Sequence, residues 1–208
     1  MRRKPQQQRS EKMLQLILDG ALDAVARYGI EAVTTRHIAE RSGISVGTLY
    51  HYFSNKDDVF TALQNRLSSE LVARIRAEMQ SLVRKDIGDA VRGVLQLFME
   101  ELDRDGGKRL AFARNILHRS VERDVGRVEQ VMMEFSLAYT AAHPQLTQVK
   151  NLTRVTYILF NSVAFNLIRF LDSPSALVGR EELIEGLSDM CVAYISSQMP
   201  AGTEFPDG

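Results

Sequence analysis

The stretch Thr34–Lys56 reads TTRHIAERSGISVGTLYHYFSNK and contains two short helix signals separated by a glycine turn. Thr34 and Ser45 stand directly before the two helical segments, where a side-chain oxygen can accept hydrogen bonds from the unpaired amides of a first helical turn. Gly43 lies between the segments and can adopt the left-handed conformation that ends a helix. The spacing therefore predicts two helices joined by a tight turn, which is the helix-turn-helix arrangement.

The second of these helices, Ser45–His51, is predicted to present small side chains at its start. Val46 and Thr48 can contact a thymine methyl group in the major groove of DNA, and the Thr48 hydroxyl can hydrogen-bond a base edge. Gly47 lets the backbone come close to whatever the helix faces. These residue types indicate a helix that reads bases.

Aromatic and basic residues follow. Tyr50, His51 and Tyr52 carry polar tips that can reach phosphates on either side of a groove. Lys56 opens the next helix, where a capping residue and the helix dipole already favour an anion, so we expect its ammonium group to contact phosphate.

The same stretch resembles the N-terminal signature of the TetR family of bacterial transcriptional regulators, over about residues 10 to 60. The matching residues are Gly29-Ile30, Thr34-Thr35, Ile38-Ala39, Gly43-Ile44-Ser45, the run Gly47-Thr48-Leu49-Tyr50-His51-Tyr52-Phe53 and Lys56-Asp57. The resemblance implies a homodimer in which each subunit has a three-helix DNA-binding domain and a larger all-helical domain that binds an effector and dimerises. It also implies a partner, double-stranded operator DNA of near-palindromic sequence.

The resemblance carries roles to individual residues of this chain. Phosphate contacts are implied for Thr35 and Arg36, base reading for Ser45, Val46, Gly47 and Thr48, and backbone contacts for Tyr50, His51, Tyr52 and Lys56. Two positions depart from the family pattern. Val46 stands where many relatives carry a lysine or another polar residue, and His37 stands where an acidic capping partner is usual.

The charge distribution agrees with a nucleic-acid partner although the chain is neutral overall. Lys and Arg number 26, as do Asp and Glu. Residues 1–56 nevertheless hold nine basic against five acidic residues, so positive charge collects at the end that carries the predicted reading helix. The basic tail of Arg2, Arg3, Lys4 and Arg9 either adds contacts to DNA or is a solvated terminus.

Periodicity along the chain predicts an all-α fold. Apolar residues recur at helical spacing in residues 14–28, and further helices are expected from about residue 55, after Asp86, and over 108–119, 122–142, 147–171 and 180–198. Alternating strand patterns are absent. We expect a helix-turn-helix DNA-binding domain over residues 1–56 and a helical effector-binding and dimerisation domain over residues 57–208.

The two C-terminal helices are the expected dimer interface. Residues 152–170 are apolar on most sides, which requires neighbours all round. The core of one subunit can cover one face and a partner subunit the other. The helix 181–197 is a second contributor, which would give a four-helix contact across a two-fold axis.

A small-molecule effector of unstated identity is expected in the C-terminal half. The candidate pocket residues are Asn115, His118, Tyr157, Asn161 and Phe165. Apolar walls with a few polar groups are typical of ligand sites. The alternative for each polar residue is a core position satisfied by a neighbouring backbone group.

The sequence favours no catalytic residue, cofactor or metal site. Its four histidines lack metal-site spacing, Cys191 has no visible activating base, and a phosphate-binding glycine loop is absent. The longest apolar run, 155–168, is broken by polar residues and too short to span a bilayer. Together with the lack of a leader-like N-terminus, this indicates a soluble, cytoplasmic protein without membrane contact.

Three functional interpretations remain open. The first is a ligand-responsive repressor, in which an effector favours a conformer whose reading helices are wrongly spaced for the operator. The second is a helix-turn-helix protein that binds DNA without a ligand, as an architectural or partner-regulated binder. The third is a protein-interaction hairpin whose tyrosines are a buried anchor.

Overall fold

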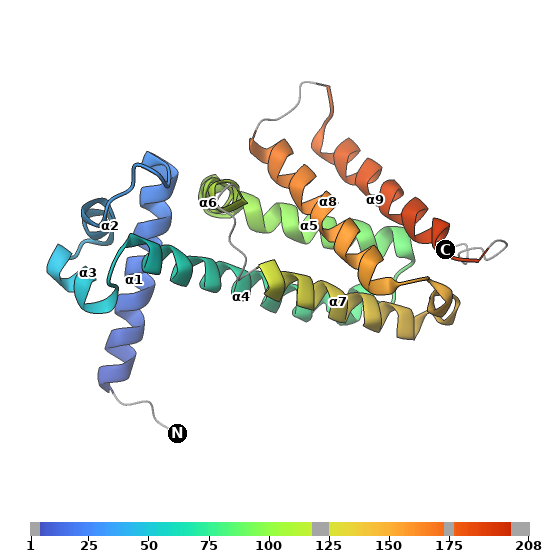
Figure 1. Cartoon of the computed structure of the whole chain (residues 1–208), viewed down its shortest axis with the longest axis horizontal. Helices are drawn as coiled ribbons and strands as arrows, with labels where there is room; N and C mark the ends of the chain where they lie inside the picture. The colour runs from blue at the N-terminus through green and yellow to red at the C-terminus, as the bar shows by residue number, and fades with distance from the viewer. Residues whose placement is uncertain (1–4, 118–124, 173–176, 201–208) are drawn as a thin grey trace. The chain divides into compact units, whose positions relative to one another are not determined.

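A computed structural model describes residues 5–117, 125–172 and 177–200, and every regular element in these ranges is helical, which confirms the all-α prediction (Figure 1). The α-helices are α1 (Pro5–Tyr28), α2 (Thr35–Ser42), α3 (Val46–Tyr52), α4 (Lys56–Leu82), α5 (Ile87–Asp103), α6 (Lys108–Leu117), α7 (Val125–Ala142), α8 (Leu152–Asp172) and α9 (Arg180–Ser197). Two 3₁₀-helices, η1 (Arg104–Gly107) and η2 (Pro144–Gln148), precede α6 and α8.

Side-chain caps fix where several helices begin. The Asp58 amide donates to Asn55 Oδ1 at 2.9 Å ahead of α4, and the Asp89 amide donates to Asp86 Oδ1 at 2.9 Å ahead of α5. The backbone N–H of Asp89 holds the pKa of Asp86 below its usual value of 3.8. The predicted helix from residue 147 begins later, at Leu152, because Pro144 opens a separate 3₁₀ turn and Asn151 adopts a left-handed conformation with φ 55°.

Packing divides the chain into two compact units. The first comprises Met1–Leu67 and Asp103–Val121, and the second comprises Ser68–Leu102 and Glu122–Gly208. The division falls inside α4, because Val59, Phe60 and Leu63 of α4 are buried with Phe112 of α6 in the core of the first unit. Helices α1, α2 and α3 thus share one core with the start of α4 and with α6.

A close contact with α1 sets the position of α2, the first helix of the predicted helix-turn-helix pair. Gly20 of α1 lies against Ser42 of α2 so tightly that a Cβ atom at Gly20 would come within 2.7 Å of the Ser42 backbone nitrogen. The Ser42 hydroxyl is buried and donates to the Ile38 carbonyl at 2.8 Å. Only glycine at position 20 permits this approach.

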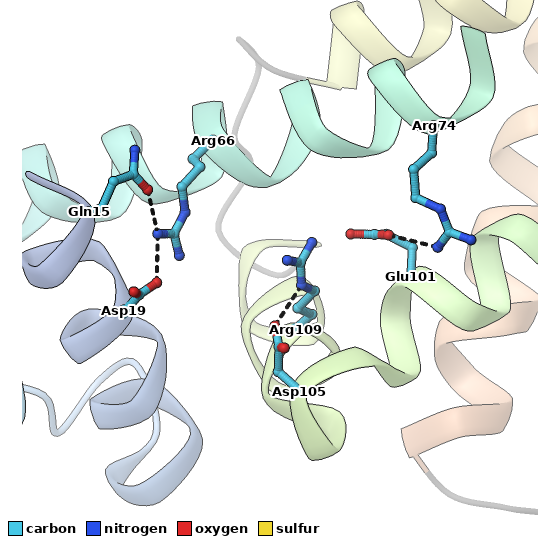
Figure 2. Close-up of polar contacts among 7 residues, drawn as sticks. All are labelled: Gln15, Asp19, Arg66, Arg74, Glu101, Asp105 and Arg109. Atoms are coloured by element: carbon cyan, nitrogen blue, oxygen red, sulfur yellow. Dashed lines mark hydrogen bonds and ion pairs between the residues drawn. The ribbon is translucent and has the colours of Figure 1, made fainter. Parts of the chain in front are cut away.

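Arginines anchor α4 within each unit (Figure 2). In the first unit, Arg66 of α4 reaches Asp19 at 2.7 Å and Gln15 at 3.0 Å on α1. In the second unit, Arg74 of α4 pairs with Glu100 and Glu101 at the end of α5, the Glu101 contact being 3.0 Å. These pairs link α4 to the helix packed beside it in both units.

The second unit packs α5, α7, α8 and α9 around one apolar core, with α8 and α9 side by side (Figure 1). Hydrogen bonds add to this packing. Tyr139 of α7 donates to the Lys85 carbonyl at 2.8 Å, and Ser188 of α9 donates to the Gly88 carbonyl at 3.2 Å. Burial of the Tyr139 phenol raises its pKa to about 12, with a further rise from the charge of Asp86, so the hydroxyl stays protonated and donates.

Candidate nucleic-acid interface and ligand cavity

The first helix of the pair, α2, is capped from both directions. Thr34 Oγ1 accepts from the His37 amide at 3.2 Å, and His37 Nδ1 accepts from the Thr34 amide at 3.4 Å. This reciprocal pair is the capping box that an acidic residue usually completes. His37 therefore serves as the capping partner despite its departure from the family pattern, and its ring also stacks on Tyr28 at 4.3 Å.

The turn between the helices has the conformation that the sequence predicts. Gly43 is left-handed with φ 66°, and its amide donates to the Ala39 and Glu40 carbonyls. The Ile44 amide donates to the Ala39 carbonyl at 3.0 Å. Ser45 then caps α3, because its Oγ accepts from the Thr48 amide at 3.0 Å and lies 2.8 Å from Thr48 Oγ1.

Helix α3 presents most of its surface to solvent. Leu49 is its buried residue and packs into the core of the first unit. Tyr50 is 53% exposed and Val46 is 37% exposed, and Gly47 and His51 are exposed as well. A short helix held by one buried leucine, with Val46, Tyr50 and His51 exposed, is sterically free to enter a groove.

The residues predicted to flank the reading helix make three separate contacts. Thr35 Oγ1 and the Tyr50 hydroxyl lie 3.3 Å apart, which places one side chain from α2 and one from α3 together. Arg36 is exposed and pairs with Glu40 at 2.9 Å. Tyr52 is half-buried against the core, and its ring lies nearly perpendicular to that of His51, with the ring centroids 5.3 Å apart.

Lys56 has a structural partner that the sequence did not indicate. Its ammonium group donates to the Glu31 carbonyl at 3.2 Å and to the Val33 carbonyl at 3.0 Å, both in the loop between α1 and α2. These carbonyls lie 23 to 25 residues earlier in the chain. The lysine thereby holds the loop that precedes α2, and its predicted phosphate contact would have to share the same group.

An acidic residue links three helices of the first unit. Asp23 of α1 pairs with Lys108 of α6 at 2.8 Å and with Arg41 in the last turn of α2. The Lys108 hydrogen bond, together with that from Arg41, holds the pKa of Asp23 below its usual value of 3.8 against the opposing effect of burial. This contact ties the end of α2 to α6.

A largely apolar cavity of about 120 Å³ lies inside the second unit. Its walls come from α5, α7, η2, α8 and α9, with Val94 and Phe98 of α5 and Val163 of α8 among them. A single water needs only ~10–15 Å³, so the cavity has room for an organic molecule. Its polar groups are the side chains of Ser136, Tyr139, Thr140, Thr156 and Cys191.

The residues predicted for the pocket lie elsewhere. Asn115 bonds its own helix through the Ala111 carbonyl at 2.6 Å. On α8, Tyr157 and Phe165 are 59% and 63% exposed, and Asn161 donates to the Tyr157 carbonyl at 2.9 Å. None of these four residues lines the cavity, and His118 lies outside the described residues.

Tyr157, Asn161 and Phe165 do not reach the cavity because of the way α8 is rotated about its axis. The cavity-facing residues Thr156, Phe160 and Val163 follow one helical stripe, and Tyr157, Asn161 and Phe165 follow the opposite stripe. Thr156 stands among apolar neighbours at that inward spacing. The polar Thr156 at an inward-facing position is the feature of the sequence that could have identified the α8 wall of the cavity.

Taken together, a capped and exposed second helix on a compact helical domain defines the helix-turn-helix class of nucleic-acid-binding proteins. The family model for bacterial regulatory proteins of the tetR family matches residues 17–63, which include α2, α3 and their turn. Residues 17–63 are therefore similar to the bacterial regulatory proteins of the tetR family.

Curated relatives match over part of their length. The chain is 29% identical over 107 residues to the nucleoid occlusion factor SlmA of Glaesserella parasuis, covering 51% of this chain and 50% of that protein. It is 27% identical over 136 residues to the transcriptional repressor KstR of Mycobacterium tuberculosis, covering 65% and 52%. The chain thus spans about half the length of these relatives.

Solved structures show the same fold over nearly the whole chain. The transcriptional regulator FadR of Bacillus subtilis, crystallised in complex with stearoyl-CoA, has a TM-score of 0.69 at 14% identity, with 89% of this chain and 99% of that chain covered. Within the described ranges of this chain, none of the helices is long and apolar enough to cross a membrane. The same ranges contain no cluster of three or more His, Cys, Asp or Glu side chains suited to a metal ion.

Proposed function

We propose that this protein is a sequence-specific DNA-binding transcriptional regulator that works as a homodimer. The observation that carries the proposal is the outward face of α3, where Val46, Tyr50 and His51 are exposed on a helix fixed by its Ser45 cap. In this proposal Ser45, Val46, Gly47 and Thr48 read bases.

The dimer forms through α8 and α9. Large apolar side chains point outward from these helices, among them Tyr157, Ile158, Phe165 and Met190. Exposed apolar side chains that gather on one face mark association surfaces. A symmetric pair would present two α3 helices to successive major grooves, ~34–36 Å apart on a near-palindromic operator.

Ligand control is the second part of the proposal. The cavity in the second unit is the effector site, and its occupant favours a dimer whose α3 helices no longer match the operator. Support comes from KstR, a relative named as a repressor, and from the FadR structure solved with stearoyl-CoA. By linkage, operator DNA must weaken effector binding by the same factor by which the effector weakens operator binding.

A second candidate is DNA binding without a small ligand. The similarity to a protein named as a nucleoid occlusion factor favours it. The two candidates differ in one respect. A cavity ligand lowers operator affinity in the first and leaves it unchanged in the second.

Selection of bound sites from random DNA by the purified full chain tests the DNA-binding proposal. We expect enrichment of one near-palindromic sequence, with an affinity that falls steeply as salt rises because phosphate contacts release counterions. Recovery of unenriched DNA, or an affinity insensitive to salt, would overturn it.

A further inference from the structure

The cavity wall contains no charged side chain among the described residues that line it. Its aliphatic and aromatic residues include Val94, Phe98 and Val163. Burial raises the pKa of the Cys191 thiol to about 11, so this group is also uncharged at neutral pH. A ligand charge buried here would lose its hydration without gaining an ion pair, which is strongly unfavourable.

Three of the hydroxyl groups at the cavity donate to fixed acceptors. Thr156 Oγ1 donates to Ser136 Oγ at 3.0 Å, and Ser136 Oγ donates to the Met132 carbonyl at 2.9 Å. Tyr139 donates its hydroxyl hydrogen to the Lys85 carbonyl. A hydroxyl has one hydrogen and two lone pairs, so the hydrogens of these three residues are used and their oxygens can still accept.

Thr156 is the first member of the Thr156–Ser136–Met132 chain, and its Oγ1 receives no hydrogen bond from Ser136 or Met132. The residue is buried and lines the cavity together with Ser136. A ligand hydroxyl that donated to Thr156 Oγ1 would extend the chain by one bond. A ligand carbonyl or ether oxygen would find no free hydrogen at these three residues, which leaves Thr140 as the remaining hydroxyl of the wall.

From these observations we propose that the cavity binds a neutral, apolar molecule that carries one hydrogen-bond-donating hydroxyl group, an aliphatic alcohol or a phenol, with the hydroxyl donating to Thr156 Oγ1. The ligand class rests on the proposed effector site and specifies its chemistry. Carboxylates and ammonium ions of the same length are rejected because the wall cannot compensate their charge.

Isothermal titration of the full chain with four matched eight-carbon probes tests this assignment. n-Octanol is neutral and donates, heptyl methyl ether is its isomer without a donor, and octanoate and octylammonium carry opposite charges. We expect n-octanol to bind at least tenfold more tightly than either ion and several-fold more tightly than the ether.

The variant Thr156→Val removes the acceptor and nearly preserves the volume. It should weaken n-octanol binding roughly two- to tenfold, the value of one hydrogen bond, and leave ether binding unchanged. The variant Ala164→Leu adds volume at the cavity wall and should weaken both neutral probes, which shows that they bind inside. Thermal melting of each variant checks that it remains folded.

Several outcomes would overturn the assignment. They are octanoate or octylammonium binding as tightly as n-octanol, the ether matching n-octanol, equal n-octanol affinity for Thr156→Val, or no n-octanol binding. Operator affinity is measured separately with and without n-octanol. If n-octanol binds as expected but operator affinity does not change, the ligand chemistry stands and the proposed ligand control fails.

Discussion

At the scale of single residues, Lys56 has two roles, an observed contact with the loop before α2 and a predicted contact with DNA. Its ammonium group holds the Glu31 and Val33 carbonyls, so Lys56→Met should lower the melting temperature. Leaving those acceptors without their donor costs about 1–3 kcal/mol. If Lys56 also contacts phosphate, the slope of log affinity against log salt should fall by about one as well.

Thermal unfolding and operator titration at several salt concentrations separate the two roles of Lys56. The variant Lys56→Arg keeps the charge and serves as the control, with a salt slope close to that of the parent. An unchanged melting temperature in Lys56→Met would contradict the loop role.

The ion pairs of Asp23 give the first unit a pH dependence. Lys108 and Arg41 lower the pKa of Asp23 in the folded chain, so its contribution to stability is complete above the unfolded value of 3.8 and is lost as the pH falls through the lower folded pKa. Asp23→Asn should therefore lower the urea midpoint at pH 7, and the difference from the parent should vanish in acid. The partly exposed pairs limit the effect to about 1 kcal/mol.

A matched control for Asp23→Asn is Glu40→Gln, because Glu40 forms an exposed pair with Arg36 one turn away on α2. We expect this variant to change the urea midpoint much less. Equal effects of the two substitutions at pH 7 would show that the link from α1 to α6 adds nothing to stability.

At this scale the sequence predicted the features that depend on residues close by in the chain. The Thr34 and Ser45 caps and the left-handed Gly43 involve bonds within a few residues, and the structure has all three. The partners of Lys56 and Asp23 lie on distant segments. Lys56 bonds to two backbone carbonyl groups. Every residue has a backbone carbonyl, so the residue types in the sequence do not indicate this contact.

At the scale of elements, the contact between α1 and α2 depends on Gly20. A Cβ atom there would overlap the backbone of Ser42, which cannot move without shifting α2. Gly20→Ala should destabilise the first unit by about 1–3 kcal/mol, the usual cost of overpacking. Chemical unfolding of the parent and the variant measures this loss of stability.

Gly47→Ala is the control for that substitution, since the Cβ atom would meet only Ser45 Oγ at 3.7 Å. Stability should stay near the parent value. Because the new methyl group lies on the outer face of α3, operator affinity should fall if the backbone approaches DNA there. A stable Gly20→Ala protein would contradict the close-contact account.

Helix existence was easier to predict than helix rotation. Apolar spacing indicated α8, but its many apolar positions fit more than one buried stripe. Tertiary packing selects the stripe with Thr156 and Val163 for the cavity and leaves Tyr157 and Phe165 outside. Three of the residues predicted for the pocket, Tyr157, Asn161 and Phe165, therefore lie on the other face of α8 from the cavity.

At the scale of the whole molecule, the outer face of α8 should control assembly. Phe165→Glu places a charge on a side chain that is 63% exposed in the single subunit, so the subunit should still fold while the dimer dissociates. Light scattering after size-exclusion chromatography measures the mass. Leu137→Glu on α7, at a side chain 56% exposed, is the control and should remain dimeric.

A monomeric parent, or equal dissociation of both variants, would contradict the predicted interface. Loss of the dimer should also lower operator affinity, because two linked reading helices bind with a higher effective concentration than one.

The fold class and the bounds of α2 and α3 could be predicted from the sequence, because caps, turns and helical periodicity depend on short segments of sequence. The division into two units did not, because α6 joins the first core through Phe112, far along the chain from α1–α3. The cavity likewise depends on five elements meeting at one place.

The central claim is that two exposed α3 helices read one duplex from the same side. Hydroxyl-radical footprinting of the selected operator with the full chain measures this most directly. We expect two protected patches on one face of the DNA, one helical turn of ~10–10.5 base pairs apart from centre to centre. Thr48→Ala should change the sequence preference at one position in each patch. A single patch, protection without spacing, or equal loss of affinity on all sequences in Thr48→Ala would contradict it.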